Sequence, residues 1–207
     1  SSKACAEIVT TCWRNSFFHP DDYGKSHEIL IASARAGNVI GGGDWAADRL
    51  IPDIMRAASK DEKVKIRNPH ATRPWQHVLE PLSGYLLLGQ KLLEGRREFA
   101  EAWNFGTAEQ DNLSVGEIVE QIREMWPRID YEIHQSPSQP HEAGLLRLDC
   151  SKARIQLKWF PVWTGKETIE KTVEWYRTFY ESGKVQSIYH LNCYIESAKS
   201  KNIAWAE

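Results

Sequence analysis

Residues 38–51 combine an amide, three glycines and an arginine in an order suited to binding an anion. Asn38 ends a segment typical of a strand, and Gly41 to Gly43 follow it as a flexible loop. A helix is then expected to begin near Arg49 and Leu50. The first N–H groups of a helix lack intrahelical partners and a guanidinium is a bidentate donor, so both attract phosphate. We therefore predict a site for an anionic ligand, although the glycine triplet taken alone indicates only a loop.

Two further arginines and a His-Glu pair are candidates for the same site. Arg67 and Arg73 lie in the next loop and could add phosphate contacts, although a single arginine is more often a solvated surface residue. His141 and Glu142 stand in a loop with two prolines, where they could bind ligand hydroxyls or form a surface turn. The glycine triplet lacks the spacing of a P-loop or a dinucleotide fingerprint, and no histidine accompanies a nucleophile elbow.

The four cysteines and seven histidines show no spacing typical of a metal site, and we predict none. Cys5 and Cys12 share a helix face, but seven residues at a rise of ~1.5 Å place them about 10 Å apart, beyond the reach of a disulfide. We expect reduced thiols packed as small hydrophobic groups, and hence a protein of the reducing cytoplasm.

Length and composition describe a globular protein with a substantial core. The 207 residues suffice for one large domain or two small ones, and 42% are hydrophobic while 26% are charged. The net charge of -2 comes from mixed acidic and basic residues, so a nucleic-acid partner is not expected. No apolar stretch approaches the ~18 residues of a membrane-spanning helix.

Helices and strands are expected to alternate along the chain, which favours an α/β layer architecture. We predict helices over residues 1–18, from about 50 with Pro52 in the first turn, and over 82–93, 115–125, 151–157 and 164–181, with a docked helix in the tail. Ser114 and Glu117 have the spacing of a capping box. Strands are expected over residues 28–33, 64–66, 102–106, 131–134 and 145–148.

Side-chain periodicity predicts which faces of these helices are buried. The helix after residue 50 has an apolar face of Ile51, Ile54, Met55 and Ala58, and the tail helix has one of Ile188, Leu191, Ile195 and Ala198. We also expect an outward ion pair between Glu167 and Lys171. Core packing accounts for the positions of four tryptophans, Trp13, Trp103, Trp159 and Trp175.

Several strings of residues resemble one enzyme family. The start, Ser1-Ser2-Lys3-Ala4-Cys5-Ala6-Glu7, looks like the end of the Tyr-x-x-x-Lys motif of the extended short-chain dehydrogenase/reductases. Within that group, longer strings resemble the CDP-glucose 4,6-dehydratases, and they lie at residues 35–45, 48–53, 67–78, 103–106, 141–142 and 148–153. The resemblance extends over residues 1–182, and its Gly-Gly-Gly-Asp-Trp and Arg-Asn-Pro-His strings are far more specific than a single glycine motif.

The resemblance implies a fold and a reaction. It implies the C-terminal part of a Rossmann-type NAD-binding fold with a smaller α/β domain that binds the nucleotide sugar. Residues 1–45 would be the remainder of the Rossmann domain, residues 46–182 mainly the sugar-nucleotide domain with some segments returning to the Rossmann sheet, and residues 183–207 a helical tail. The family uses bound NAD to convert CDP-glucose into CDP-4-dehydro-6-deoxy-D-glucose and water. It also implies that the full-length enzyme is a homodimer that pairs through the first helix, and it leaves open whether these 207 residues dimerise alone.

Individual site residues follow from the same resemblance. Lys3 matches the family lysine that touches the nicotinamide ribose and lowers the pKa of the tyrosine base. The residues matched to the nucleotide diphosphate are Asn38, Arg49, Leu50, Arg73 and Asn104. Glu142 matches an acidic residue that contacts the ribose, and His141 stands beside it. Where related thymidine-nucleotide dehydratases have an arginine two residues before the matched histidine, this sequence has Gln139.

The catalytic residues that the family places upstream are not in this sequence. The matched tyrosine would lie four residues before Lys3, and the glycine-rich NAD loop and the acid/base carboxylate also lie before residue 1. The sequence is therefore expected to be a C-terminal portion that has no dehydratase activity alone. Two alternatives stay open: another dehydratase or an epimerase on the same scaffold, and a non-catalytic module that binds nucleotide sugars.

Overall fold

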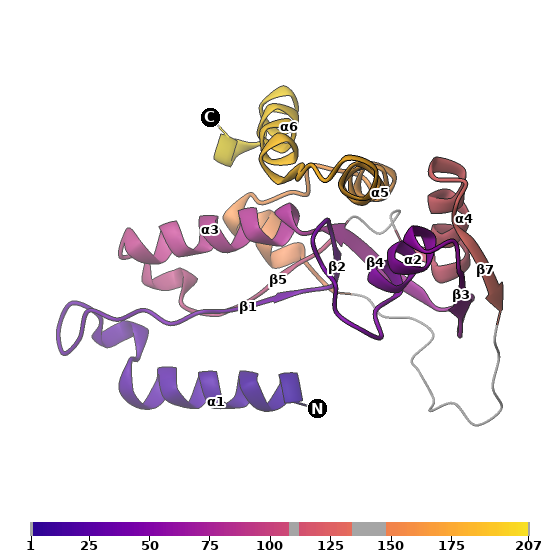
Figure 1. The fold of residues 1–207 in the computed structure, drawn as a ribbon. Helices are drawn as coiled ribbons and strands as arrows, with labels where there is room; N and C mark the ends of the chain where they lie inside the picture. Colours follow the sequence, from indigo (N-terminus) through magenta and orange to yellow (C-terminus); the bar gives the residue numbers. More distant parts are fainter. Residues whose placement is uncertain (1, 108–111, 134–147, 207) are drawn as a thin grey trace.

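The computed structural model describes residues 2–107, 112–133 and 148–206, and it has the predicted α/β architecture (Figure 1). The described strands are short and form three separate small sheets. β1 (Ser33–Ala36) pairs in parallel with β5 (Ala102–Phe105), and β3 (Lys63–Ile66) pairs in parallel with β7 (Asp130–Ile133). β2 (Asn38–Ile40) pairs in parallel with β4 (Thr72–His77), which pairs antiparallel with β6 (Asn112–Ser114).

Gly37 separates β1 from β2, and the chain changes strand partner at this residue. A Cβ atom at Gly37 would lie 3.1 Å from the side chain of Pro74 on β4, so a larger residue would force the strands apart. The close approach lets the residues on either side of Gly37 pair with two different strands, Ala36 with Phe105 and Asn38 with Trp75.

Six helices of ten or more residues cover the strands. They are α1 (Ser2–Phe17), α2 (Leu50–Ser59), α3 (Leu79–Leu93), α4 (Val115–Met125), α5 (Gly165–Ser182) and α6 (Ser187–Ser200). Short helical turns span Pro20–Asp22, Arg97–Phe99, Ala153–Leu157 and Ala204–Ala206. In Figure 1, α1 and α3 lie on opposite sides of β1, and α5 and α6 lie above the β2–β4 pair and α3. In the described part of the chain, no helix has both the length and the hydropathy that crossing a bilayer requires.

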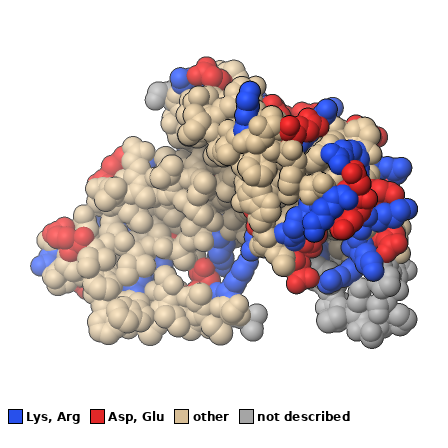
Figure 2. Space-filling model, viewed as in Figure 1, with Lys and Arg blue, Asp and Glu red and all other residues tan. Residues whose placement is uncertain are grey.

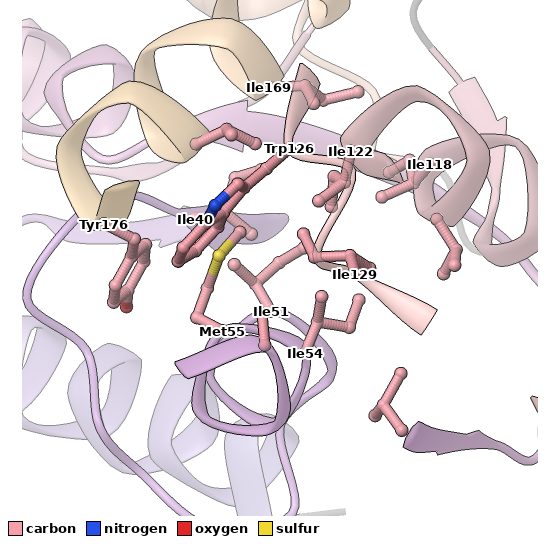
Figure 3. Packing of buried hydrophobic residues seen from close by; sticks show 14 of the residues in the cluster. Ile40, Ile51, Ile54, Met55, Ile118, Ile122, Trp126, Ile129, Ile169 and Tyr176 are labelled. Atoms are coloured by element: carbon pink, nitrogen blue, oxygen red, sulfur yellow. The ribbon is translucent and has the colours of Figure 1, made fainter. Parts of the chain in front are cut away.

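The buried hydrophobic residues form one main cluster and two smaller ones. The main cluster joins α2, α4 and α5 over β3 and β4, and Figure 3 shows isoleucines from these elements around Met55 and Trp126. Its α2 members are the predicted face, and Ile51, Ile54, Met55 and Ala58 are at most 3% exposed. Full burial of each large aliphatic side chain contributes about 1.5–3 kcal/mol, so this face fixes the position of α2.

Local signals located two helix starts correctly. Ser114 Oγ accepts a hydrogen bond from the N–H of Glu117 at 3.2 Å, and the Glu117 carboxylate accepts the N–H of Ser114 at 2.7 Å. The predicted capping box is thus confirmed. Thr164 and Glu167 form a second capping box at the start of α5.

Two element boundaries were wrong. Residues 28–32 were expected in a strand, but β1 begins at Ser33, because its parallel partner β5 begins opposite at Ala102. Ile29 accordingly remains 47% exposed. The third long helix begins at Leu79 instead of residue 82, because Pro81 occupies the first turn, where no N–H partner is required. The strand expected at 145–148 lies mostly outside the described residues, and His134, the last residue of the strand expected at 131–134, also lies outside them.

The tail helix exists, but only part of its predicted face is buried. Ala198 is buried as predicted, whereas Ile188 is 71% exposed and Leu191 is also exposed, and the other buried residues are His190 and Tyr194. The aromatic side chain of Tyr194 reaches the interior and decides the face, since its hydroxyl donates a hydrogen bond to buried Glu80 at 2.8 Å. Apolar periodicity alone predicts that Ile188 is buried in preference to Tyr194.

Three packing predictions were also wrong. Trp103, Trp159 and Trp175 are buried as expected. Trp13 is 54% exposed, and no residue of its helix α1 is buried. Cys5 and Cys12 on the same helix are exposed and not packed. Glu167 does not pair with Lys171: its carboxylate caps the N–H of Thr164 at 2.8 Å and lies 3.5 Å from Lys201, while Lys171 pairs with Glu174 at 2.8 Å.

Candidate functional site

A cleft of about 830 Å³ lies between α2, β2, β3 and β4. Five of the predicted ligand residues line it: Asn38, Arg49, Leu50, Arg67 and Arg73. They are separated by up to 35 positions in the sequence, from 38 to 73, and the strand pairing brings them together. The cleft has the size expected of a pocket for a ligand of small-molecule dimensions.

Strand register and helix capping position these side chains. Asn38 begins β2 and stands opposite Trp75 of β4, two residues after Arg73. Arg49 is the N-cap residue of α2, and its extended backbone turns the chain into the helix at Leu50. The unpaired N–H groups of the first turn of α2 therefore start at the cleft, where they favour negative charge.

The lining of the cleft carries an excess of positive charge. Seven lysines and arginines line it against four acidic residues. The basic residues are Arg49, Arg56, Lys60, Lys63, Lys65, Arg67 and Arg73. Figure 2 shows blue and red side chains gathered on the side where Figure 1 places α2 and β3, while the half with α1 and α3 is mostly uncharged on this face. The excess favours an anionic ligand.

The arginines at the cleft differ in exposure and partners. Arg49 Nη1 lies 3.1 Å from Asp44 Oδ2 with 65% of its side chain exposed, and Arg67 Nη2 lies 3.6 Å from Asp48 Oδ1. Exposed pairs of this kind contribute about 0–1 kcal/mol, so they leave both guanidinium groups available to an anionic ligand. Arg73 is buried, and its Nη1 donates to the carbonyl oxygen of Thr72 at 2.9 Å.

Other predicted residues lie away from the cleft or outside the described residues. Lys3 is exposed in the first turn of α1 and does not line the cleft. Asn104 of β5 also lies outside its lining; its Nδ2 donates to the carbonyl oxygen of Asp149 at 2.9 Å, and its buried Oδ1 has no hydrogen-bond donor among the described residues. His141, Glu142 and Gln139 fall in residues 134–147, outside the described part.

The structure adds ligand candidates that sequence reasoning missed. Lys63 and Lys65 alternate with buried Val64 and Ile66 on β3, so both ammonium groups point to the same face of the strand. This exposed-buried alternation was visible in the sequence and would have identified them. Asp44 also lines the cleft, but its partner Arg49 is five residues away across an irregular loop, and no periodicity predicts that contact.

The loop of the glycine triplet contacts α5 on one side and the cleft on the other. A Cβ atom at Gly42 would lie 2.0 Å from the indole of Trp175, so that indole lies directly on the glycine backbone. Gly41 and Asp44 line the cleft. Within the described residues, no group of three or more His, Cys, Asp or Glu side chains is arranged to hold a metal ion.

Comparison with known proteins gives one curated relative and many solved structures. No protein-family model matches the chain. The chain is 49% identical over 179 residues to CDP-glucose 4,6-dehydratase of Salmonella typhimurium strain LT2, which covers 86% of this chain and 50% of that protein. It thus spans about half the length of the curated relative that it matches.

Solved structures of similar fold are nucleotide-sugar enzymes. A dTDP-glucose 4,6-dehydratase from Bacillus anthracis in complex with NAD matches with a TM-score of 0.67 at 21% identity, covering 87% of this chain and 52% of that one. An epimerase from Methanothermobacter thermautotrophicus matches with a TM-score of 0.66 at 25% identity, covering 84% of this chain and 48% of that one. A UDP-glucose 4-epimerase from Thermotoga maritima with UDP-glucose matches with a TM-score of 0.66 at 20% identity, covering 85% and 52%.

Proposed function

Most of this chain is related in sequence to CDP-glucose 4,6-dehydratase, and on that premise we propose that its cleft binds the nucleotide diphosphate of CDP-glucose. The main support is that one cleft with an excess of basic residues is lined by Asn38, Arg49, Arg67 and Arg73. A diphosphate is the part of a nucleotide sugar that such a set of guanidinium groups recognises best, because it accepts bidentate, charge-assisted hydrogen bonds.

Each lining group has a separate role in this proposal. Arg49 is exposed and can bind phosphate oxygens through guanidinium N–H groups other than the one donated to Asp44, and exposed Arg67 can reorient from Asp48 onto them. Arg73 is buried at the wall of the cleft and supplies a fixed positive charge. The amide of Asn38 can donate to a phosphate or sugar oxygen, and Leu50 offers an apolar contact for the ligand.

For the whole protein we propose the 4,6-dehydratase reaction, which converts CDP-glucose into CDP-4-dehydro-6-deoxy-D-glucose and water. NAD is the proposed cofactor, and the solved neighbours with bound NAD support it. When bound, NAD accepts a hydride from the sugar and returns it within one turnover. Lys3 is the residue of this sequence that the resemblance matches to an NAD contact. Because the family's tyrosine base and glycine-rich NAD loop are not among the 207 residues, we expect this chain to bind substrate without turning it over.

Assembly and domain organisation are proposed from the same relationship. We propose domain boundaries near residues 45 and 182, a cytoplasmic location and a homodimer. The apolar face of α1 supports the dimer, because Ile8, Val9, Trp13 and Phe17 are each more than half exposed. Size-exclusion chromatography with light scattering tests this: Trp13→Asp should shift a dimer to the monomer mass, and a monomeric unmutated chain would contradict it.

Isothermal titration calorimetry with CDP-glucose tests the proposed site. The wild-type chain should bind CDP-glucose and CDP, and Arg49→Ala and Arg73→Ala should each weaken binding about tenfold or more, since a hydrogen bond to a charged group contributes ~1.5–3 kcal/mol. Arg123→Ala is the matched control, because Arg123 is exposed on α4 and does not line the cleft. Absence of binding, or equal losses in all three variants, would contradict the proposal.

A second function has support from the solved neighbours, several of which are epimerases. UDP-glucose and dTDP-glucose in the same titration distinguish the candidates. The dehydratase proposal expects CDP-glucose to bind most tightly, whereas preference for UDP-glucose would favour an epimerase. If NAD leaves the affinity for CDP-glucose unchanged and no turnover occurs, a binding module without catalytic activity is the better description of this chain.

A further inference from the structure

The loop of Gly41 to Trp45 is held from outside the cleft by α5. The indole of Trp175 lies on Gly42, and the ring of Trp45 meets the rings of Trp175, Tyr176 and Phe179 at centroid distances of 5.3–5.8 Å. The Trp45 indole N–H also donates to the hydroxyl of Tyr180 at 3.3 Å. Four aromatic residues of one helix thus contact this loop.

The hydroxyl of Tyr176 binds both backbone groups of Asp44. It accepts the N–H of Asp44 at 3.0 Å and donates to the carbonyl oxygen of Asp44 at 2.5 Å. Tyr176 is 1% exposed, and burial raises the pKa of its hydroxyl to about 12, so the hydroxyl keeps the proton that it donates. In Figure 3, the ring of Tyr176 lies at the edge of the main cluster. These two bonds fix the peptide units on both sides of Asp44.

The side chain of Asp44 transmits this position to the cleft. Its Oδ1 accepts a hydrogen bond from the N–H of Ala46 at 2.9 Å, and its Oδ2 accepts one from Arg49 Nη1 at 3.1 Å. Both Asp44 and Arg49 line the cleft. A continuous path of hydrogen bonds therefore joins the buried hydroxyl on α5 to a guanidinium group of the proposed site, through one aspartate.

We propose that Tyr176 is a positioning residue for ligand binding: through Asp44 it orients the Arg49 guanidinium toward a nucleotide diphosphate. The proposal rests on the proposed function of the cleft for its ligand, but the path itself is a property of the chain. An exposed arginine loses side-chain entropy when it binds a ligand. If the Asp44 carboxylate already holds the Arg49 side chain in place, less entropy is lost on binding.

The test combines nucleotide binding with a direct observation of Arg49. Tyr176→Phe removes only the hydroxyl, and Tyr85→Phe makes the same change at a half-buried tyrosine of the second hydrophobic cluster, outside the cleft. Calorimetry gives the affinity for CDP-glucose of both variants, of Arg49→Ala and of the double variant. NMR relaxation of the Arg49 Nε–Hε group and hydrogen exchange of the Asp44 amide report on the path without any ligand.

Tyr176→Phe removes both hydrogen bonds to the Asp44 backbone, and we expect it to weaken CDP-glucose binding about fivefold and to have no further effect in the Arg49→Ala background. Arg49 Nε should become more mobile and the Asp44 amide should exchange faster, while Tyr85→Phe changes none of these. A merely structural role for Tyr176 would weaken binding equally with and without Arg49. Either that result or unchanged Arg49 mobility overturns the proposal.

Two outcomes separate this inference from the function on which it rests. If the wild-type chain binds no CDP-glucose, the proposed function fails, and the Arg49 and Asp44 measurements still decide whether the path exists. If Tyr176→Phe does not fold, Asp44→Asn replaces it, because it keeps the backbone bonds to Tyr176 and removes the charged acceptor of Arg49. That variant should show the same mobile Arg49, and an immobile Arg49 there overturns the proposal.

Discussion

Replacement of the buried carboxylate of Glu80 is predicted to destabilise the junction of α3, α6 and the segment before α5. Glu80 has no exposed surface, and its oxygens accept the N–H of Val162 at 2.9 Å, the N–H of Trp163 at 2.7 Å and the hydroxyl of Tyr194 at 2.8 Å. In Glu80→Gln, one carbonyl oxygen replaces two carboxylate oxygens, so at least one backbone N–H loses its acceptor. A buried donor without a partner costs about 1–3 kcal/mol, and we expect a loss of about 2 kcal/mol at pH 7.

The pH dependence of this loss follows from the pKa of Glu80. Burial outweighs the hydrogen bonds from Trp163, Val162 and Tyr194 and raises that pKa from 4.5 to about 7. Between these values the folded protein holds a proton that the unfolded chain has released, so the free energy of unfolding of the wild type rises as the pH falls. From pH 7 to pH 5 this adds about 2 kcal/mol, because each unit of pKa difference is worth ~1.4 kcal/mol. Glu80→Gln lacks the effect.

Urea unfolding of wild type and Glu80→Gln at pH 5, 6 and 7 measures both effects. The difference in free energy of unfolding should widen from about 2 kcal/mol at pH 7 to about 4 kcal/mol at pH 5. Glu94→Gln is the control, since Glu94 is exposed at the end of the same helix and should change stability by less than ~0.5 kcal/mol. A difference that stays constant between pH 7 and pH 5 would refute the reasoning about Glu80.

Four other substitutions give independent checks by urea unfolding. Gly42→Ala should cost ~2 kcal/mol or more, because its Cβ would lie 2.0 Å from Trp175, whereas Gly89→Ala in α3 meets no atom within 4 Å and should stabilise by up to ~1 kcal/mol. Ser114→Ala removes the capping box of α4 and should cost about 1 kcal/mol; no loss would show that the cap is dispensable. Burial lowers the pKa of His77 to about 3, so between pH 6.5 and pH 5 the unfolded chain takes up a proton that the folded protein does not. The free energy of unfolding of the wild type should therefore fall by about 2 kcal/mol relative to that of His77→Asn over this range. The same pH dependence in both proteins would contradict this.

The helices with strong local signals were predictable because a few neighbouring residues decide them. α2 and α4 follow from apolar spacing, Pro52 in a first turn and the capping box at Ser114. The strand over residues 28–33 failed for the opposite reason: its apolar composition is local, but a strand exists only where a partner supplies hydrogen bonds, and β5 does so from Ser33 onward. The exposed positions of Trp13 and Ile188 likewise depend on what the rest of the fold brings against α1 and α6.

For the candidate site, the sequence alone determined the chemistry and the structure decided the geometry. Residue types made Asn38, Arg49, Arg67 and Arg73 candidate phosphate ligands, because guanidinium and amide groups have that chemistry in any fold. That they share one cleft depends on the pairing of β2 with β4 and on the docking of α2, which are contacts between distant segments. The path from Tyr176 spans 132 positions to Asp44, and only tertiary packing could bring that hydroxyl to the loop.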